Sequence, residues 1–241
     1  MIIYGLNPVL EALRAGRAVR LRVARQRHDQ RVQQVLQLAA EHRVPVEQVD
    51  ARDLERAAHG GVHQGVVAEV QDRAEFSVAE IVGQANGAPL VVVLDGVEDP
   101  HNFGAILRVA DAAGADGVVR QSRHAAALDG AAARASAGAI AHVPIATVVN
   151  IARAVEELKE AGVWTVGLAG DAKQRYSELD LRLPTALVVG AEGSGLRRLV
   201  RDRCDVLASI PMKGHVESLN VSVATGIVLF EAVRQREARD A

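Results

Sequence analysis

The sequence predicts an α/β protein whose larger part is built on a mostly parallel sheet. Short apolar runs recur after residue 89 and alternate with segments of helical spacing, which is the pattern of strand-helix-strand units. The run PLVVVLD (89–95) is continuously apolar, as is typical of a strand covered on both faces. With 241 residues, 49% of them hydrophobic, the chain can bury a substantial core.

The first 70 residues predict a smaller α/β unit, because helical and extended patterns alternate there at shorter intervals. Asn7 and Pro8 suit the cap and first position of a helix that stops at Gly16. The further elements expected are a strand RLRVA (20–24), a helix over 32–43, and strands VPVEQVD (44–50) and GVVAEV (65–70).

The following segment loses this regularity and predicts a linker that contains one short helix. We therefore divide the chain into a domain of residues 1–72, a linker of 73–88 and a domain of 89–241. The second domain should continue with a helix from Phe103 to Ala113. Its further strands are expected within DGVVR (116–120), HVPIATV (142–148), VWTVGLAG (163–170), TALVVGAEG (185–193) and DVLASIP (205–211).

Composition excludes several classes of protein. No window approaches the run of about 18 apolar residues that a membrane span needs, and the first residues lack the pattern of a secretory signal, so we expect a cytoplasmic protein. Cys204 is the only cysteine, which excludes an internal disulfide and predicts a small core residue. The eight histidines are scattered, so no metal site is expected. No dinucleotide fingerprint or Walker loop occurs.

Positive charge is concentrated near the start of the chain, although the whole chain has a net charge of −2. Residues 14–43 hold eight arginines against two acidic residues. Such a block can bind phosphates, or it can be a solvated helix face. The arginines that we consider as candidates for RNA contact are Arg14, Arg17, Arg20, Arg22, Arg25, Arg27 and Arg31.

Three segments leave predicted strands with unusual chemistry, and ligands collect beyond the carboxyl ends of parallel strands. In DGVEDPHNFGAILR (95–108), Asn102 could be a helix N-cap, and Arg108 could be either a solvated residue or an anion clamp. In VVGAEGSGL (188–196), Glu192 lies between glycines, in either a tight turn or a bare backbone surface that a flat adenosine can approach.

The third segment, IPMKGHVESLN (210–220), precedes an almost wholly apolar stretch. Ser218 or Asn220 can cap the helix that follows, but capping does not explain both of them. A helix over 221–233 that is apolar nearly all round fits a segment buried by both its own core and a partner.

In order and spacing, DPHNFGAILR, VVGAEGSGL and IPMKGHVESLNVSVATG resemble the three motifs of the SpoU/TrmH family of RNA ribose 2′-O-methyltransferases, within the SPOUT superfamily. GLNPVLEAL and GGVHQGVVAEV resemble the ends of the family's substrate-binding domain. The closing segment is especially similar to members that methylate a guanosine in the peptidyl-transferase region of 23S ribosomal RNA.

The resemblance implies a fold that the patterns alone do not predict: a parallel-sheet domain with a deep trefoil knot, preceded by an RNA-binding domain of the ribosomal-protein L30e type. It implies a homodimer, and it favours RNA contact for the arginine block. It also implies S-adenosylmethionine as cofactor, bound near Gly190, Glu192, Gly193, Ile210, Met212 and Leu219.

The family's functional positions are all present, namely Asn102, Arg108, Glu192, Ser218 and Asn220. A guanidinium stays protonated in proteins, so we expect Arg108 to bind a phosphate and stabilise the developing alkoxide rather than act as a base. Asn102 would hold the loop or the ribose, and Ser218 and Asn220 would position Arg108 or the target nucleotide. The alternatives are a transfer-RNA or other-site ribosomal-RNA methyltransferase of the same family, and a non-catalytic RNA-binding or assembly factor.

Overall fold

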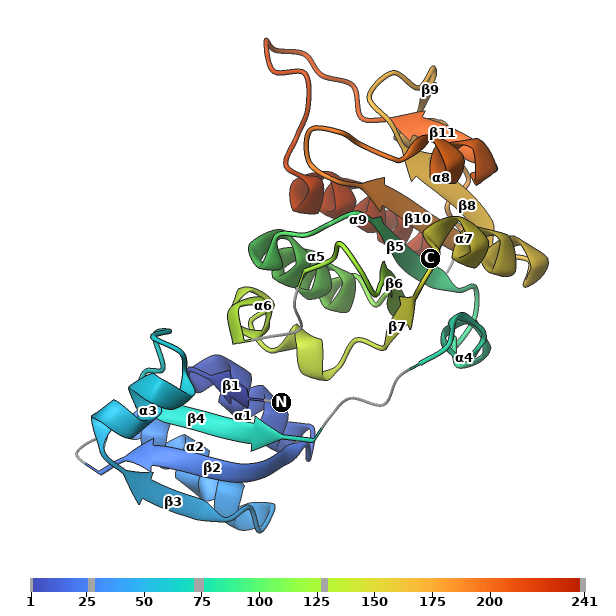
Figure 1. Ribbon diagram of the computed structural model, residues 1–241. Coiled ribbons are helices and arrows are strands. Elements are labelled where there is room, and N and C mark those ends of the chain that lie inside the picture. Colours follow the sequence, from blue (N-terminus) through green and yellow to red (C-terminus); the bar gives the residue numbers. More distant parts are fainter. Residues whose placement is uncertain (1, 26–28, 72–75, 127–129, 239–241) are drawn as a thin grey trace. The chain divides into compact units, whose positions relative to one another are not determined.

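The computed structural model describes residues 2–25, 29–71, 76–126 and 130–238, which form two compact units (Figure 1). Unit 1 comprises the described parts of residues 1–74 and 127–142. Unit 2 comprises the described parts of residues 75–126 and 143–241. Each unit has its own sheet.

The sheet of unit 1 has the strand order β1-β4-β2-β3. Strand β4 is antiparallel to β1 and β2, and β2 is parallel to β3. Alternation along β2 buries Leu21 and Val23 on one face and places Arg20 and Arg22 on the other. The strands are β1 (Ile2–Tyr4), β2 (Ala18–Ala24), β3 (Val46–Val49) and β4 (Val66–Val70).

Helices pack on both faces of this sheet. Helix α1 buries Leu6, Leu10 and Leu13, whose spacing follows the helical repeat. Leu54 of α3 packs with Tyr4 and with the other residues of a separate cluster on the opposite face. The helices are α1 (Leu6–Arg14), α2 (Gln30–Glu41), α3 (Ala51–Ala57), α6 (Gly130–Ala135) and the 3-10 helix η1 (Ala139–Ala141).

The predicted cap of the first helix is wrong. Helix α1 begins at Leu6 with Gly5 as its N-cap, so Asn7 lies inside the first turn. Gly5 has φ 94°, a conformation that glycine adopts at little cost, so the chain can turn from β1 directly into the helix. The predicted strands within 20–24, 44–50 and 65–70 are confirmed, whereas β1 and α3 were not predicted because they are too short to show a period.

The sheet of unit 2 has the order β7-β6-β5-β10-β8-β11-β9, and every neighbouring pair is parallel, which confirms the predicted parallel sheet. Strand β5 lies inside this sheet and is buried along its whole length, as its continuous apolar run predicts. The strands are β5 (Leu90–Asp95), β6 (Gly117–Gln121), β7 (Ile145–Val148), β8 (Trp164–Leu168), β9 (Gln174–Arg175), β10 (Thr185–Gly190) and β11 (Val206–Ser209).

Both faces of the second sheet are covered. Residues of α4, α7 and α8 share one core cluster with Val91 and Val93 of β5. Helices α5 and α9 pack against each other and lie on the opposite face, where α9 also contacts β10 (Figure 1). These helices are α4 (Val78–Gly83), α5 (Pro100–Ala112), α7 (Ile151–Glu160), α8 (Arg198–Arg203), α9 (Val221–Glu237) and the 3-10 helix η2 (Tyr176–Glu178).

The compact units differ from the predicted domain boundaries at two places. The short helix expected in the linker is α4, and its residues Val78 and Ile81 belong to the core of unit 2. Helices α6 and η1 lie within the predicted second domain but pack in unit 1, where His142 Nε2 is 3.1 Å from Glu11 Oε2. Sequence periodicity indicates that a short helix has an apolar face, but not which core that face covers.

Cys204 is a partly buried residue packed against the core of unit 2, which confirms the predicted role. Its thiol donates a hydrogen bond to the carbonyl of Val200 at 3.3 Å, and burial raises the pKa of the thiol to about 12. Within the described ranges, no helix is long and apolar enough to cross a membrane. The same residues contain no group of three or more acidic, histidine or cysteine side chains that could hold a metal ion.

Candidate functional site

The three motif segments meet in unit 2 through a chain of side-chain hydrogen bonds. Asn220 Nδ2 donates to Asn102 Oδ1 at 2.8 Å, and Asn102 Nδ2 donates to Glu192 Oε2 at 3.0 Å. Each of these residues comes from a different motif, and the two hydrogen-bonded pairs are 90 and 118 positions apart along the chain. The structure therefore assembles Asn102, Glu192 and Asn220 into one group.

Two helix starts hold this group in place. Asp99 is the N-cap of α5, and its carboxylate accepts from the backbone N–H of Asn102 at 3.1 Å. The expectation that Asn102 is itself an N-cap is therefore wrong: it is a first-turn residue because Pro100 already starts the helix. Asn220 is the N-cap of α9 and accepts from the backbone N–H of Ser222 at 2.9 Å, whereas Ser218 does not cap this helix.

A pocket of about 340 Å³ lies at the carboxyl ends of β8, β10 and β11. Its wall includes Glu192 and Ser218 of the family positions, but neither Asn102 nor Arg108. All the residues predicted to contact the cofactor also line it, namely Gly190, Glu192, Gly193, Ile210, Met212 and Leu219. The pocket is the place in unit 2 where the second and third motifs face each other.

The lining of the pocket offers apolar side chains and exposed backbone. The turn after β10 packs tightly on itself: a Cβ on Gly190 would lie 2.1 Å from the carbonyl carbon of Gly195. Gly193 and Gly195 have positive φ values of 83° and 67°, which side-chain-bearing residues rarely adopt. Glycine is therefore required here by the backbone, and the same absence of side chains leaves the backbone open to a ligand.

Arg108 and Ser218 lie outside the hydrogen-bonded group. Arg108 is exposed on α5, and among the described residues it has no hydrogen bond or ion pair. Its guanidinium is thus available to an anion. Ser218 is exposed at the pocket wall, in the loop before α9.

The arginines proposed to contact RNA do not form one patch. Arg20 and Arg22 lie on the face of the unit 1 sheet that carries α3, whereas Arg31 of α2 donates to the side chain of Asn7 in α1. Arg27 lies outside the described residues. Neighbours in sequence are therefore divided between two faces of the unit.

Several of these arginines already have partners. Arg17 is half-buried and donates to the carbonyl of Gln71 at 3.3 Å, and burial lowers its pKa. Arg25 donates to the carbonyl of Gln48 at 3.3 Å. Acidic side chains pair with Arg14 through Glu11 and with Arg22 through Glu47. The positive charge of the block is thus partly neutralised within the unit.

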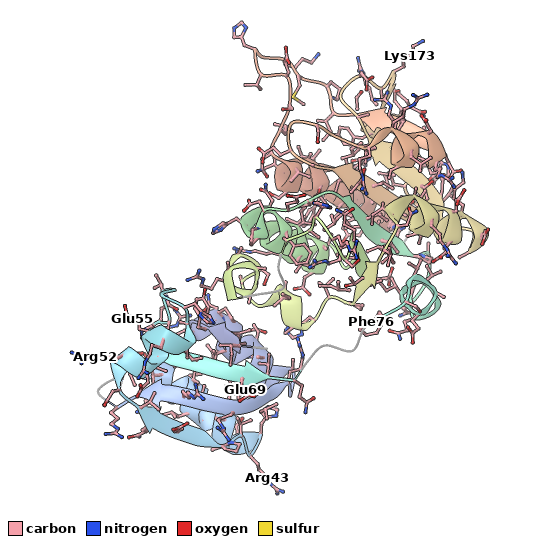
Figure 2. The ribbon with its side chains drawn as sticks, viewed as in Figure 1. Arg43, Arg52, Glu55, Glu69, Phe76 and Lys173 are labelled. Atoms are coloured by element: carbon pink, nitrogen blue, oxygen red, sulfur yellow. The ribbon has the colours of Figure 1, made fainter. Side chains whose placement is uncertain are left out.

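The α3 face adds basic residues that lie outside the predicted block. Arg52 and Arg56 are both exposed on α3, and Arg56 borders a hollow shared with Arg22. Figure 2 shows Arg52 extending outward from α3 and Arg43 extending outward from the turn after α2. Arg52 and Arg56 were missed because the acidic residues beside them in the sequence cancel their positive charge in a count of net charge. A search for arginines on the exposed side of α3 would have found both.

Two ion pairs near the pocket were also missed. Arg201 donates to both oxygens of Asp171 at 2.9 Å, and this contact holds the pKa of that carboxyl below its usual range. Both residues line the pocket. Asp95, the fully buried last residue of β5, binds Arg197 after the glycine turn. Neither pair has a sequence signal, because its partners are 30 or more positions apart.

A family model described as the SpoU rRNA Methylase family matches residues 89–230, more than half of the chain. The chain belongs to this family. A second model, described as RNA 2′-O ribose methyltransferase substrate binding, matches residues 2–75 of this SpoU methylase. The resemblance expected from the three motifs is thereby confirmed.

Relatives of this SpoU methylase match it along its length. The 23S rRNA (guanosine-2′-O-)-methyltransferase RlmB of Pseudomonas aeruginosa is 48% identical over 239 residues, which are 97% of this chain and 96% of the relative. The putative TrmH family tRNA/rRNA methyltransferase YacO of Bacillus subtilis is 41% identical over 97% of this chain and 95% of the relative.

A solved structure is similar over nearly the whole chain. The SpoU methyltransferase AviRb from Streptomyces viridochromogenes, in complex with the cofactor AdoMet, has a TM-score of 0.83 and 28% identity. The match covers 99% of this SpoU methylase and 91% of AviRb. The fold and the order of the elements are therefore shared with an enzyme solved with its cofactor.

Asn220 both caps α9 and donates to Asn102, so one substitution at this position should lower activity without lowering stability. Asn220→Asp keeps the oxygen that caps α9, so the free energy of unfolding should change by less than about 0.5 kcal/mol. It loses the donor to Asn102, and if the amide of Asn102 flips, its oxygen faces Glu192 instead. We expect methyl transfer to fall by about tenfold or more.

This prediction is checked by denaturant unfolding together with single-turnover methylation. Asn150→Asp is the matched control, because Asn150 caps α7 through its side chain and is not part of the group. Unchanged transfer by Asn220→Asp would show that the bond to Asn102 has no part in the reaction.

Proposed function

We propose that this chain transfers a methyl group from S-adenosylmethionine to the ribose 2′-hydroxyl of a guanosine in the peptidyl-transferase region of 23S ribosomal RNA. One observation carries this conclusion: Asn102, Glu192 and Asn220 are joined beside a pocket lined by the residues that the family motif assigns to the cofactor. The similarity to RlmB over nearly the whole length of both chains supports guanosine in 23S RNA as the substrate.

The pocket residues fit S-adenosylmethionine. Ile210, Met212 and Leu219 offer apolar surface to an adenine. A flat group can approach the backbone closely at Gly193, where an added Cβ would meet nothing within 4 Å. When bound, the cofactor supplies an activated methyl group on a sulfonium. Glu192 holds its carboxylate at the pocket wall while accepting from Asn102, so it links cofactor binding to the first motif.

The protein must orient the ribose hydroxyl and stabilise the charge that develops as its proton leaves. Arg108 is exposed and permanently charged, so it can bind the neighbouring phosphate and stabilise the developing alkoxide. Asn102 and Asn220 fix each other's amide orientation, and Ser218 presents a hydroxyl at the pocket wall toward the nucleotide. The proton passes to phosphate or water.

The same proposal includes a trefoil knot in unit 2. Strand β10 lies between β5 and β8, and the chain then crosses to β11 before α9 returns to pack on α5 and β10. This return of the chain supports a C-terminal segment threaded behind the pocket. Unit 1 is proposed to be an RNA-binding domain of the L30e type, because it has a small mixed sheet with helices on both faces and matches the substrate-binding family model.

We assign RNA contact to the exposed arginines of unit 1. Arg20 is exposed on β2, and the α3 face on which it lies also carries Arg52 and Arg56. Exposed guanidinium groups bind phosphate through paired hydrogen bonds and release counterions. A ribosomal-RNA substrate supports a cytoplasmic location, which we include in the proposal.

A homodimer is proposed through α9. Val223 and Phe230 lie seven positions apart on this helix, so they project from the same side, and their side chains are 50% and 49% exposed. Large apolar side chains exposed in a row are typical of protein interfaces. Arg108 lies on the neighbouring helix α5, so this interface would bring it near the second subunit.

The interface predicts that Phe230→Glu converts the dimer into a monomer, because burying an unpaired carboxylate at a contact is costly. Sedimentation equilibrium measures the mass directly. Val149→Glu is the control, since Val149 is 89% exposed in a loop outside α9. A dimer of unchanged affinity in Phe230→Glu would place the interface elsewhere.

The activity is tested with labelled S-adenosylmethionine and unmodified 23S, 16S and transfer RNA, followed by mapping of the methylated ribose. We expect label at one guanosine of the peptidyl-transferase region. Label in transfer RNA, or at another ribosomal site, would show that the chain is a methyltransferase of the same family with a different substrate. Binding of RNA without transfer to any of them would instead support a non-catalytic assembly factor.

A further inference from the structure

The glycine turn of residues 191–196 forms one wall of the pocket, and it is anchored at its end by a buried carboxylate. Asp95, the last residue of β5, has no exposed surface. Its Oδ2 accepts from the backbone N–H of Arg197 at 2.7 Å, and its Oδ1 accepts from Arg197 Nε at 2.6 Å. The residue that follows the turn is thus held through both its backbone and its side chain.

The same guanidinium reaches a second strand end. Arg197 Nη2 donates at 2.7 Å to Oε1 of Gln121, the last residue of β6, which is 5% exposed. The Nε2 of Gln121 in turn donates to the carbonyl of His124. One side chain therefore ties the end of the turn after β10 to the carboxyl ends of both β5 and β6.

None of Asp95, Gln121 or Arg197 lines the pocket, so they cannot act by touching a ligand in it. Within the turn, the backbone N–H of Gly195 donates to the carbonyl of Ala191 at 2.9 Å, but few side chains add to this restraint. Gly193 and Gly195 provide no side chains for packing, and glycine has more conformations to lose on ordering than any other residue. Restraining such a turn before binding reduces the entropy that the ligand must otherwise offset.

We propose that Asp95, Arg197 and Gln121 are positioning residues that hold the glycine turn in the conformation that binds S-adenosylmethionine. Only the carboxylate of this ion pair is buried, because the Arg197 side chain is 56% exposed. Such a pair is a poor source of stability, because desolvating Asp95 offsets part of the attraction and solvent screens the guanidinium. Fixing the geometry of a ligand site is a use that such a pair can serve. The inference rests on the proposed function, since it takes the pocket to be the cofactor site.

The test compares two substitutions at Arg197 in the full-length protein. Arg197→Met keeps the length of the side chain and removes every donor. Arg197→Lys keeps the charge but cannot reproduce the planar fork that reaches both Asp95 and Gln121. Arg198→Met is the matched control, because the neighbouring side chain is 95% exposed.

The cofactor dissociation constant is measured by calorimetry, and kcat is measured at saturating cofactor. We expect Arg197→Met to raise the dissociation constant and the KM for S-adenosylmethionine by about tenfold and Arg197→Lys by less, with kcat within about twofold. Arg198→Met should match the wild type. Hydrogen exchange of the ligand-free protein should be faster at residues 191–197 in both Arg197 variants.

The cofactor affinity and the exchange rate of the turn together distinguish a positioning role from a purely structural one. A lowered melting temperature with unchanged cofactor affinity and unchanged exchange in the turn would overturn the proposal, because the ion pair would then only stabilise the fold. If Arg197→Met does not fold, Arg197→Lys and Gln121→Leu carry the same comparison. A wild-type protein that does not bind S-adenosylmethionine would refute the proposed function itself, whatever the variants do.

Discussion

Arg108→Ala is expected to reduce methyl transfer by about a thousandfold while the dissociation constant of S-adenosylmethionine stays within about twofold. Arg108 is exposed on α5 and does not line the pocket, so its removal should leave cofactor contacts intact. Among the described residues no carboxylate neutralises it, which leaves its charge for the substrate. Removing a preorganised group that stabilises developing negative charge commonly lowers kcat by two to three orders of magnitude. The reduction expected here is at the upper end of that range.

The measurement is single-turnover methylation of 23S RNA at saturating cofactor, with calorimetric binding of the cofactor in parallel. Arg108→Lys should be intermediate, because lysine keeps the charge but cannot bind a phosphate through two parallel hydrogen bonds. Arg153→Ala is the control: Arg153 is an exposed helical arginine whose partner, Glu157, is on its own helix. Near-normal turnover by Arg108→Ala would remove Arg108 from the mechanism.

Gly190→Ala is expected to abolish cofactor binding in the accessible concentration range and to lower the free energy of unfolding by about 2 to 3 kcal/mol. The added Cβ would lie 2.1 Å from the carbonyl carbon of Gly195 and 2.3 Å from the backbone nitrogen of Leu196. These are backbone atoms, so the clash cannot be relieved by moving a flexible side chain. The turn must open, and the wall of the pocket moves with it.

Gly170→Ala is the matched control, because Gly170 lines the same pocket and a Cβ there would meet nothing within 4 Å. It should bind the cofactor nearly as the wild type does. Denaturant unfolding and calorimetry measure the two expected effects separately. Wild-type affinity in Gly190→Ala would mean that the turn is not part of the cofactor site.

Local patterns in the sequence predicted much of the scaffold. The apolar run of β5 and the alternation of strands and helices after it were sufficient for the parallel sheet of unit 2, because a strand buried on both faces has few polar residues. The pattern failed where an element is too short to show a period, as in β1 and α3. It also failed to assign α4 and α6 to a core, because that depends on residues distant in the chain.

The candidate site, like the fold, was predicted from the sequence only in part. The motifs supplied the residue types, and the capping preferences of Asn220 were visible in the sequence, but the capping role of Asp99 displaced the one expected for Asn102. The hydrogen bonds that join Asn102, Glu192 and Asn220 could not be derived from spacing, since the partners are separated by most of a domain. The arginine block was visible as charge, yet the alternation of β2 and the packing of α2 divide it between faces.

By itself the sequence determined the α/β class, the parallel sheet, and the three segments that hold the candidate site residues, because apolar periodicity, glycine turns and helix caps are local properties. Only the tertiary structure decided that these segments meet beside one pocket and that Arg197 ties its glycine turn to the ends of β5 and β6. The physical reason is that hydrogen bonds and steric contacts act over a few ångströms. The partners are brought within that distance by the order of strands in the sheet, which local residue patterns do not specify.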